Sequence, residues 1–136
     1  MSKTVRVILC SVLITVCGGF AAKGDAERAV DQFHRMLTAH EYTQIYEAAD
    51  GVFKAATTES ELTRILQDVS DKLGAVRSAT ETGVFSQEQV GTNAGTYLRL
   101  TYNTEFDHGH ATETFTWRVA SGQVRLAGYH IASPQP

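Results

Sequence analysis

One acidic side chain falls among aromatic residues in the last third of the chain. Residues 112–119 alternate between polar and apolar types, and Glu113 has the same parity as Phe115 and Trp117. An alternation with a period of two is typical of a strand that buries one face. A carboxylate on the buried face can act as a general acid or base. A carboxylate near a strand end more often reaches water, and this is what we expect of Glu113.

Histidines supply the other candidate acid–base groups. His130 has the same parity as Val124 and Leu126 in a predicted last strand, so it can face a cavity and carry a proton. The more ordinary alternative is a packed histidine with one hydrogen bond. His34 follows Phe33 and borders the apolar stripe of a predicted helix.

Two histidines in one turn have the appearance of a metal site. His108 and His110 flank Gly109 and follow Asp107. Zinc sites use three or four fixed ligands, and this spacing matches none of their motifs. We therefore expect no metal. The sequence also has no phosphate loop, nucleophile elbow or dinucleotide fingerprint, so we expect no cofactor.

Strands account for the last third of the chain. Residues 96–105 and 112–119 alternate, and a turn at 106–110 joins them. A second turn at 120–123 leads into a strand at 124–132. A meander with one apolar face is not stable alone in water, so helices must cover that face.

The first half of the chain shows helical periodicity. Asp25 can cap a first helix that fades near His40. A second, shorter helix starts near Tyr42, and Phe53 continues its apolar stripe.

A third helix and a first strand complete the predicted elements. Thr58 and Glu61 have the spacing of a capping box, and Gly74 stands where the helix should end. Residues 76–85 then turn to β-forming types, with a change of parity at Gly83 that predicts a bulge or a bend. Residues 86–95 are polar and predict a loop. The order predicts an α+β fold, with three N-terminal helices packed on a curved antiparallel sheet of about four strands.

Several local patterns carry a resemblance to known proteins. They are Glu41-Tyr42, Ala48-Ala49, Phe53-Lys54, Leu73-Gly74 and Gly128-Tyr129-His130-Ile131. With the element order, they resemble the nuclear-transport-factor-2-like, or cystatin-like, superfamily. More narrowly, they resemble a family of small exported bacterial proteins of unknown function with that fold. The resemblance covers about residues 25–133 and implies a cone between the sheet and the first helix.

The same resemblance indicates where a site would lie. Superfamily enzymes of the ketosteroid-isomerase type line their cone with a tyrosine and an acid, which implies Tyr46 with Glu113 as the pair to test. His130 is the third catalytic candidate, and ordinary aromatic packing is the alternative for Tyr46. The residues expected to touch a ligand in the cone are Phe33, His34, Tyr46, Trp117 and His130.

The N-terminus predicts export. Lys3 and Arg6 precede an apolar run at residues 7–16 and a short stretch of small residues, which is the layout of a secretory signal peptide. We predict cleavage after Ala21, so that residues 1–21 are the signal peptide and 22–136 form one domain. Lipidation at Cys17 and an uncleaved anchor are the alternatives. The apolar run is shorter than the ~20 residues of a membrane span, so we expect no transmembrane segment in the mature chain.

Cleavage would also change the composition. Both cysteines would be lost, which excludes a disulfide or a cysteine metal site in the mature domain. The formal net charge of −3 would become more negative, because Lys3 and Arg6 lie in the removed segment. An acidic domain is a poor partner for nucleic acid.

These observations favour a periplasmic or secreted, non-catalytic module that binds a small apolar ligand or another envelope protein. A small hydrolase or isomerase that uses Glu113, Tyr46 and His130 is the alternative. A third hypothesis is a homodimer through the threonine-rich sheet face, which carries Thr112 and Thr114 and through which the superfamily often dimerises.

Overall fold

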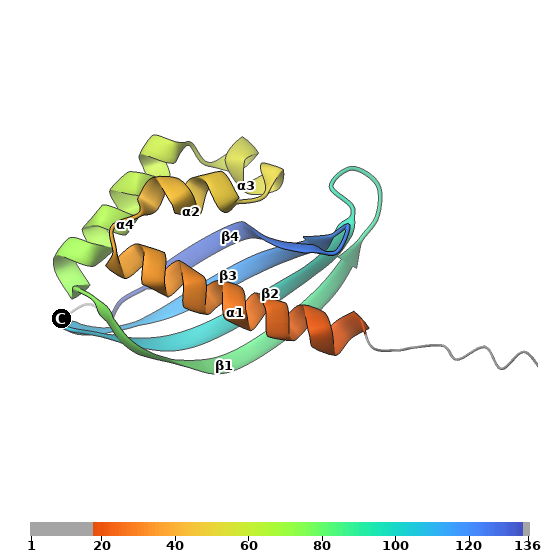
Figure 1. Ribbon diagram of the computed structural model, residues 1–136. Helices are drawn as coiled ribbons and strands as arrows, with labels where there is room; N and C mark the ends of the chain where they lie inside the picture. The colour runs from red at the N-terminus through yellow and green to blue at the C-terminus, as the bar shows by residue number, and fades with distance from the viewer. Residues whose placement is uncertain (1–17, 135–136) are drawn as a thin grey trace, which may run out of the picture.

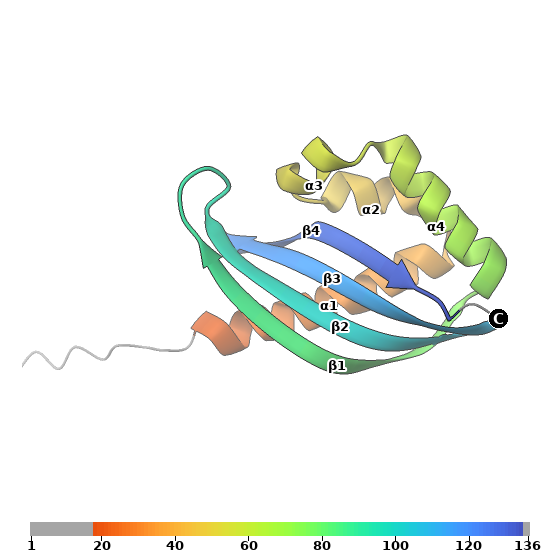
Figure 2. The same cartoon turned by 180° about the vertical axis from the view of Figure 1, so that it is seen from behind.

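The computed structural model describes residues 18–134. Four helices come first: α1 (Gly18–Thr38), α2 (Tyr42–Ala48), α3 (Gly51–Ala56) and α4 (Glu59–Leu73). Four strands follow: β1 (Val76–Gln89), β2 (Gly95–Phe106), β3 (Gly109–Ala120) and β4 (Gln123–Ala132). The helices lie on one side of the sheet, and no described element covers its other side (Figures 1 and 2).

The strands form one antiparallel meander in the order β1-β2-β3-β4. Alternation in the sequence sets its inward face, because Leu98 and Leu100 of β2 are buried, as are Phe115 and Trp117 of β3. The register pairs Leu98 with Trp117 and Leu100 with Phe115. Apolar rows therefore run across neighbouring strands, where side chains on one face stabilise each other.

Helix α1 crosses this inward face (Figure 1). Ala26, Val30, Phe33 and Leu37 recur at helical spacing, and all four are buried. The helix contacts β1, β3 and β4, so the core lies between α1 and the sheet. The later helices complete the core with Ile45, Ala49, Phe53, Leu62, Leu66 and Val69.

The expected plan of three helices packed on a curved sheet, the nuclear-transport-factor-2-like cone, is wrong. The second predicted helix is two helices, because Ala49 leaves helical geometry (φ −69°, ψ 158°) and the Asp50 side chain caps α3 by accepting from the Val52 N–H. Helices α1 and α3 contact the sheet, whereas the main contacts of α2 and α4 are with other helices. The α+β order, a helical part followed by a four-stranded antiparallel sheet, is present.

Two local predictions, a helix cap and a bulge within a strand, are confirmed. Thr58 and Glu61 form both hydrogen bonds of a capping box at the start of α4. The predicted bulge is present in β1, where the register with β2 shifts between Glu81 and Gly83. The capping box joins residues three positions apart, and a change in the parity of the apolar residues marks the bulge, which is why the sequence alone predicts both.

Two other boundary predictions are wrong. Asp25 does not cap α1, because that helix begins at Gly18 and Asp25 instead pairs with Arg28 one turn later. The expected loop at residues 86–95 is wrong in its first part, because β1 continues to Gln89. In each case the helix or strand extends beyond the residues whose apolar periodicity predicts it.

The predicted signal peptide falls mainly on residues 1–17, which lie outside the described residues, as do both cysteines. No helix in the described part of the chain has the length and apolar character needed to cross a bilayer.

Gly74 ends α4 in a backbone conformation that other residues avoid. Its φ is 79° and its ψ is −156°, and an added Cβ would lie 2.8 Å from the Cβ of Asp107. We predict that Gly74→Ala lowers the free energy of unfolding, measured by urea denaturation, by about 1–3 kcal/mol.

Gly51→Ala is the matched control. Gly51 is the first residue of α3, and an added Cβ there meets no atom within 4 Å. The control should be neutral or stabilising by up to about 1 kcal/mol, because alanine favours the helix. Equal effects of the two substitutions would contradict the strained geometry at Gly74.

Candidate functional site

A fully buried carboxylate, that of Glu113, lies on the inward face of the sheet. The Thr104 hydroxyl donates to Oε1 over 2.5 Å, and the Tyr129 hydroxyl donates to Oε2 over 2.7 Å. The Nε2 atom of His34 lies 2.7 Å from Oε1. We call Glu113, His34, Thr104 and Tyr129 the Glu113 cluster.

The sheet register and α1 together assemble this cluster. Thr104 of β2 and Tyr129 of β4 each lie one inward-facing position away from the residue that pairs directly with Glu113. Their side chains therefore approach Glu113 diagonally from both neighbouring strands. His34 comes from α1 on the opposite side, so the cluster joins the helix to the sheet.

Aromatic rings surround the cluster. The ring centroid of Phe33 lies 5.0 Å from that of Phe115 and 4.8 Å from that of Tyr129. The Phe115 centroid lies 5.2 Å from that of Tyr129 and 5.9 Å from that of Tyr102. These rings keep water away, and a charge without water must be matched by protein donors. The three donors to Glu113 meet that requirement.

Protonation of the cluster follows from its surroundings. Burial, together with the nearby Glu113 carboxylate, raises the pKa of Tyr129 well above its ordinary value. Tyr129 therefore keeps its proton and remains a donor.

The structure places the sequence-predicted catalytic residues apart. The expectation that Glu113 reaches water is wrong, since its side chain is 0% exposed. Tyr46 donates its hydroxyl to the backbone oxygen of Thr57 over 3.0 Å, and His130 is exposed on β4. Glu113 therefore meets neither of the two residues expected beside it.

A bulge in β4 explains the position of His130. The register of β3 with β4 shifts between Thr116 and Trp117, which leaves Ala127 as an extra residue. One extra residue exchanges the two faces of a strand. Tyr129 therefore points toward the core, and His130 points away from it.

Sequence reasoning named His34 and Glu113 separately and missed their pairing. The sequence does contain a signal for this pairing. Glu113 has the same strand parity as buried aromatic residues, and a buried carboxylate requires a hydrogen-bond donor, which the helix that covers the sheet can supply. His34 is the polar residue at the border of the buried stripe of α1. Thr104 and Tyr129 were missed as well, and the bulge hides the orientation of Tyr129.

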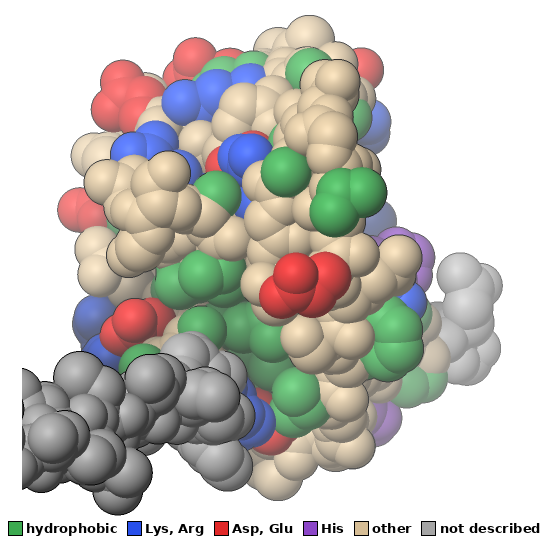
Figure 3. All heavy atoms as spheres, turned by 90° about the vertical axis from the view of Figure 1, so that its right-hand side faces the viewer, with side chains coloured by type: hydrophobic (Ala, Val, Ile, Leu, Met, Phe, Trp, Pro, Cys, Tyr) green, Lys and Arg blue, Asp and Glu red, His purple; other side chains and the backbone are tan. Residues whose placement is uncertain are grey.

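An apolar groove lies beside the cluster, between α1, α2 and the strands β3 and β4. It has a volume of about 520 Å³, within the range of about 300–1,000 Å³ that is typical of small-molecule sites. Its lining consists of Ala29, Gln32, Phe33, Met36, Glu41, Gln44, Ile45, Ala48, Trp117, Val124, Arg125 and Leu126. Apolar side chains also gather on the surface at the end of the molecule where α1 begins (Figure 3).

Trp117 forms part of the groove wall. Its ring stacks on Phe115 with the centroids 6.0 Å apart and the planes 9° from parallel. Its indole N–H is buried and has no hydrogen-bond partner among residues 18–134. A buried donor without a partner costs about 1–3 kcal/mol.

Three of the five residues predicted to contact a ligand line a hollow, and they line two different ones. Phe33 and Trp117 line the groove. His34 lines a separate, shallow depression of about 360 Å³ on the surface of α1. Tyr46 and His130 line neither hollow.

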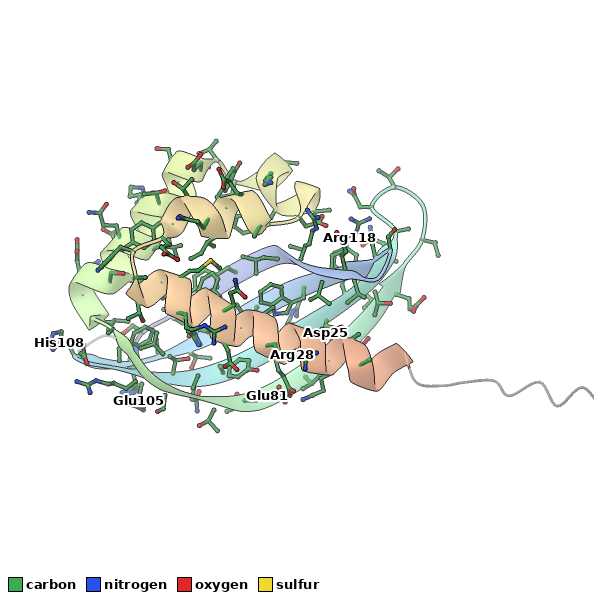
Figure 4. The ribbon with its side chains drawn as sticks, viewed as in Figure 1. Asp25, Arg28, Glu81, Glu105, His108 and Arg118 are labelled. Atoms are coloured by element: carbon green, nitrogen blue, oxygen red, sulfur yellow. The ribbon has the colours of Figure 1, made fainter. Side chains whose placement is uncertain are left out.

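An ion pair fixes the helices at one end of the groove. Arg118 contacts Asp50 at 3.1 Å and also donates to the backbone oxygen of Ala94, over 2.7 Å, in the β1–β2 loop. The backbone N–H of Asp50 donates to the oxygen of Leu126 over 2.8 Å. These bonds connect the start of α3 with β3, β4 and the loop, near which Figure 4 shows Arg118.

Within residues 18–134, no group of three or more histidine, cysteine, aspartate or glutamate side chains is arranged to hold a metal. His108 and His110 belong to the β2–β3 turn region, where Asp107 pairs with Arg77 and accepts from the Ala75 N–H. Those contacts dock the turn against the end of α4 and the start of β1.

The sequence matches the family described as protein of unknown function DUF4019 over residues 29–129. The chain belongs to this family. The expected membership of a family of unknown function is thus confirmed, and the matched range includes the four cluster residues and every residue that lines the groove. No curated protein matches the chain.

Removal of one donor tests the cluster. Tyr129→Phe leaves Oε2 of the buried Glu113 without its hydrogen bond, so we predict a loss of about 1–3 kcal/mol in the free energy of unfolding. Tyr97→Phe is the control, because the Tyr97 hydroxyl bonds a loop oxygen at the exposed surface and its loss should cost about 0.5 kcal/mol or less. Equal losses in the two variants would contradict a special role for the buried bond.

The same tyrosine predicts a dependence on pH. Its folded-state pKa is raised above the unfolded value of 10.0, so its contribution to stability is complete below pH 10 and is lost as the pH rises further. The stability difference between the wild type and Tyr129→Phe should therefore shrink above pH 10. Denaturation curves between pH 8 and 11 measure this, and a constant difference would contradict the assigned protonation.

Proposed function

We propose that this protein is an exported, non-catalytic module that binds a small ligand with an apolar body in the groove between α1, α2 and the β3–β4 strands. The observation that carries the proposal is the groove itself, about 520 Å³ with a mostly apolar lining. Sites of this kind bury the apolar part of a ligand and use a few polar groups to orient it.

The groove has walls of different origin. Phe33 and Met36 come from α1, Ile45 comes from α2, and Trp117 and Leu126 come from the sheet. Phe33, Ile45, Trp117 and Leu126 also belong to the hydrophobic core, which holds them in place before any ligand arrives. A preformed wall favours binding because little side-chain freedom is lost.

Polar residues stand among the apolar ones. Gln32 and Gln44 lie on the two helices, and Glu41 and Arg125 add opposite charges. Such groups give a ligand an orientation without providing a reaction. The Glu113 carboxylate does not line the groove, and both of its oxygens already accept hydrogen bonds. This arrangement favours binding over acid–base catalysis.

Export is the second part of the proposal. It is supported by Lys3 and Arg6 ahead of the apolar run at residues 7–16, the pattern of a bacterial secretory signal. In the periplasm or outside the cell, a small carrier would meet ligands that water dissolves poorly. Intact mass of the mature protein tests the processing, with cleavage after Ala21 expected and an intact N-terminus contradicting export by this route.

A neutral fluorescent probe, N-phenyl-1-naphthylamine, tests the groove. Trp117 is the only tryptophan of the chain and lines the groove, so bound probe should quench its emission by energy transfer. Ala48→Phe places a ring in the groove and should weaken probe binding by about tenfold or more, which corresponds to about 1.4 kcal/mol.

Ala55→Phe is the matched control, because Ala55 is exposed on α3 and does not line the groove. It should bind the probe as the wild type does. A wild type that does not bind the probe, or an Ala48→Phe variant that binds it unchanged, would overturn the proposed function.

A further inference from the structure

Two arginines face each other across neighbouring strands beside the groove. Arg118 of β3 pairs directly with Arg125 of β4 in the sheet register. Like charges in directly opposite positions repel, so this arrangement requires compensation. Only one of the two charges has an acidic partner among residues 18–134.

Arg118 has a carboxylate partner and Arg125 does not. The guanidinium of Arg118 contacts Asp50 at 3.1 Å and donates twice to the oxygen of Ala94. Arg125 donates only to the side-chain oxygen of Gln123, over 3.0 and 2.7 Å, and forms no ion pair within residues 18–134. One positive charge is therefore left without an anion at this place.

Arg125 is also the only cationic residue in the groove lining. It is exposed on the edge strand β4, between Val124 and Leu126, which also line the groove. The neutral amide of Gln123 occupies two of its N–H groups and leaves others for a further acceptor. Guanidinium and carboxylate groups match in shape and form paired hydrogen bonds.

The acidic residue of the lining lies at the other end of α2. Glu41 precedes the helix, and its backbone N–H bonds the oxygen of Met36 near the end of α1. Ala48 ends α2, and the following Asp50 bonds Leu126, next to Arg125. A negatively charged head group at Arg125 therefore avoids Glu41.

We infer that the natural ligand is an anionic amphiphile of the long-chain carboxylate class, with its head group on Arg125 and its chain against Trp117, Phe33 and Met36. The inference rests on the proposed function, since it assigns the chemistry of the ligand to the same groove. The unpartnered guanidinium supplies the specificity, and the apolar wall supplies most of the affinity.

Three ligands with the same chain separate the contributions: dodecanoate, dodecanol and dodecylammonium, each below its micelle concentration. Binding is measured by Trp117 emission and by calorimetry at pH 7.5. Dodecanoate should bind about tenfold more tightly than dodecanol, and dodecylammonium should bind most weakly. Added salt should weaken dodecanoate binding and leave dodecanol binding unchanged.

Arg125→Gln removes the charge and keeps a polar side chain. It should weaken dodecanoate binding by about tenfold and change dodecanol binding by about twofold or less. Arg64→Gln on α4 is the control, because Arg64 is exposed and does not line the groove, and it should change neither.

The outcomes distinguish this inference from the proposed function. If dodecanol binds as tightly as dodecanoate, or if Arg125→Gln binds dodecanoate as the wild type does, the carboxylate assignment is overturned while the groove stands. If none of the three ligands nor the neutral probe binds, the proposed function and the assignment fail together.

Discussion

A carboxylate without access to water must be matched by hydrogen-bond donors, and in this protein they come from three separate elements. Glu113 on β3 receives Thr104 from β2, Tyr129 from β4 and His34 from α1. No shift of the helix along the sheet can keep all three bonds. An apolar residue at position 113 would permit such shifts, so the cluster fixes one position for α1 at the expense of some stability.

That position also determines the groove. Phe33, the residue before His34, packs on Phe115 and Tyr129 beside the cluster and lines the groove as well. The groove is thus the space left between a helix held by His34 and a second helix that follows it by a short turn. Its shape depends on the hydrogen bond between His34 and Glu113, which lies outside the groove, so the role of Glu113 is structural.

The sequence predicts what neighbouring residues decide. Strand alternation around Leu98 and Phe115, the capping box at Thr58 and the bulge near Gly83 follow from local patterns, and the structure has them. It does not predict features that depend on contacts between residues far apart in the chain. The alternation of β4 is reversed by a bulge at Ala127 that depends on its pairing with β3, so Tyr129 replaces His130 on the inward face. The bond of His34 to Glu113 joins residues 79 positions apart, and only the packing of α1 on the sheet brings them together.

The direct measurement of the central claim is a double-mutant cycle between His34 and Glu113. Urea denaturation of His34→Leu, Glu113→Leu and the double variant gives their coupling free energy. Each single variant leaves a buried polar partner unmatched. We therefore expect the double variant to lose about 1–3 kcal/mol less unfolding free energy than the two single variants lose together. Additive losses would show that His34 and Glu113 do not hold α1 on the sheet.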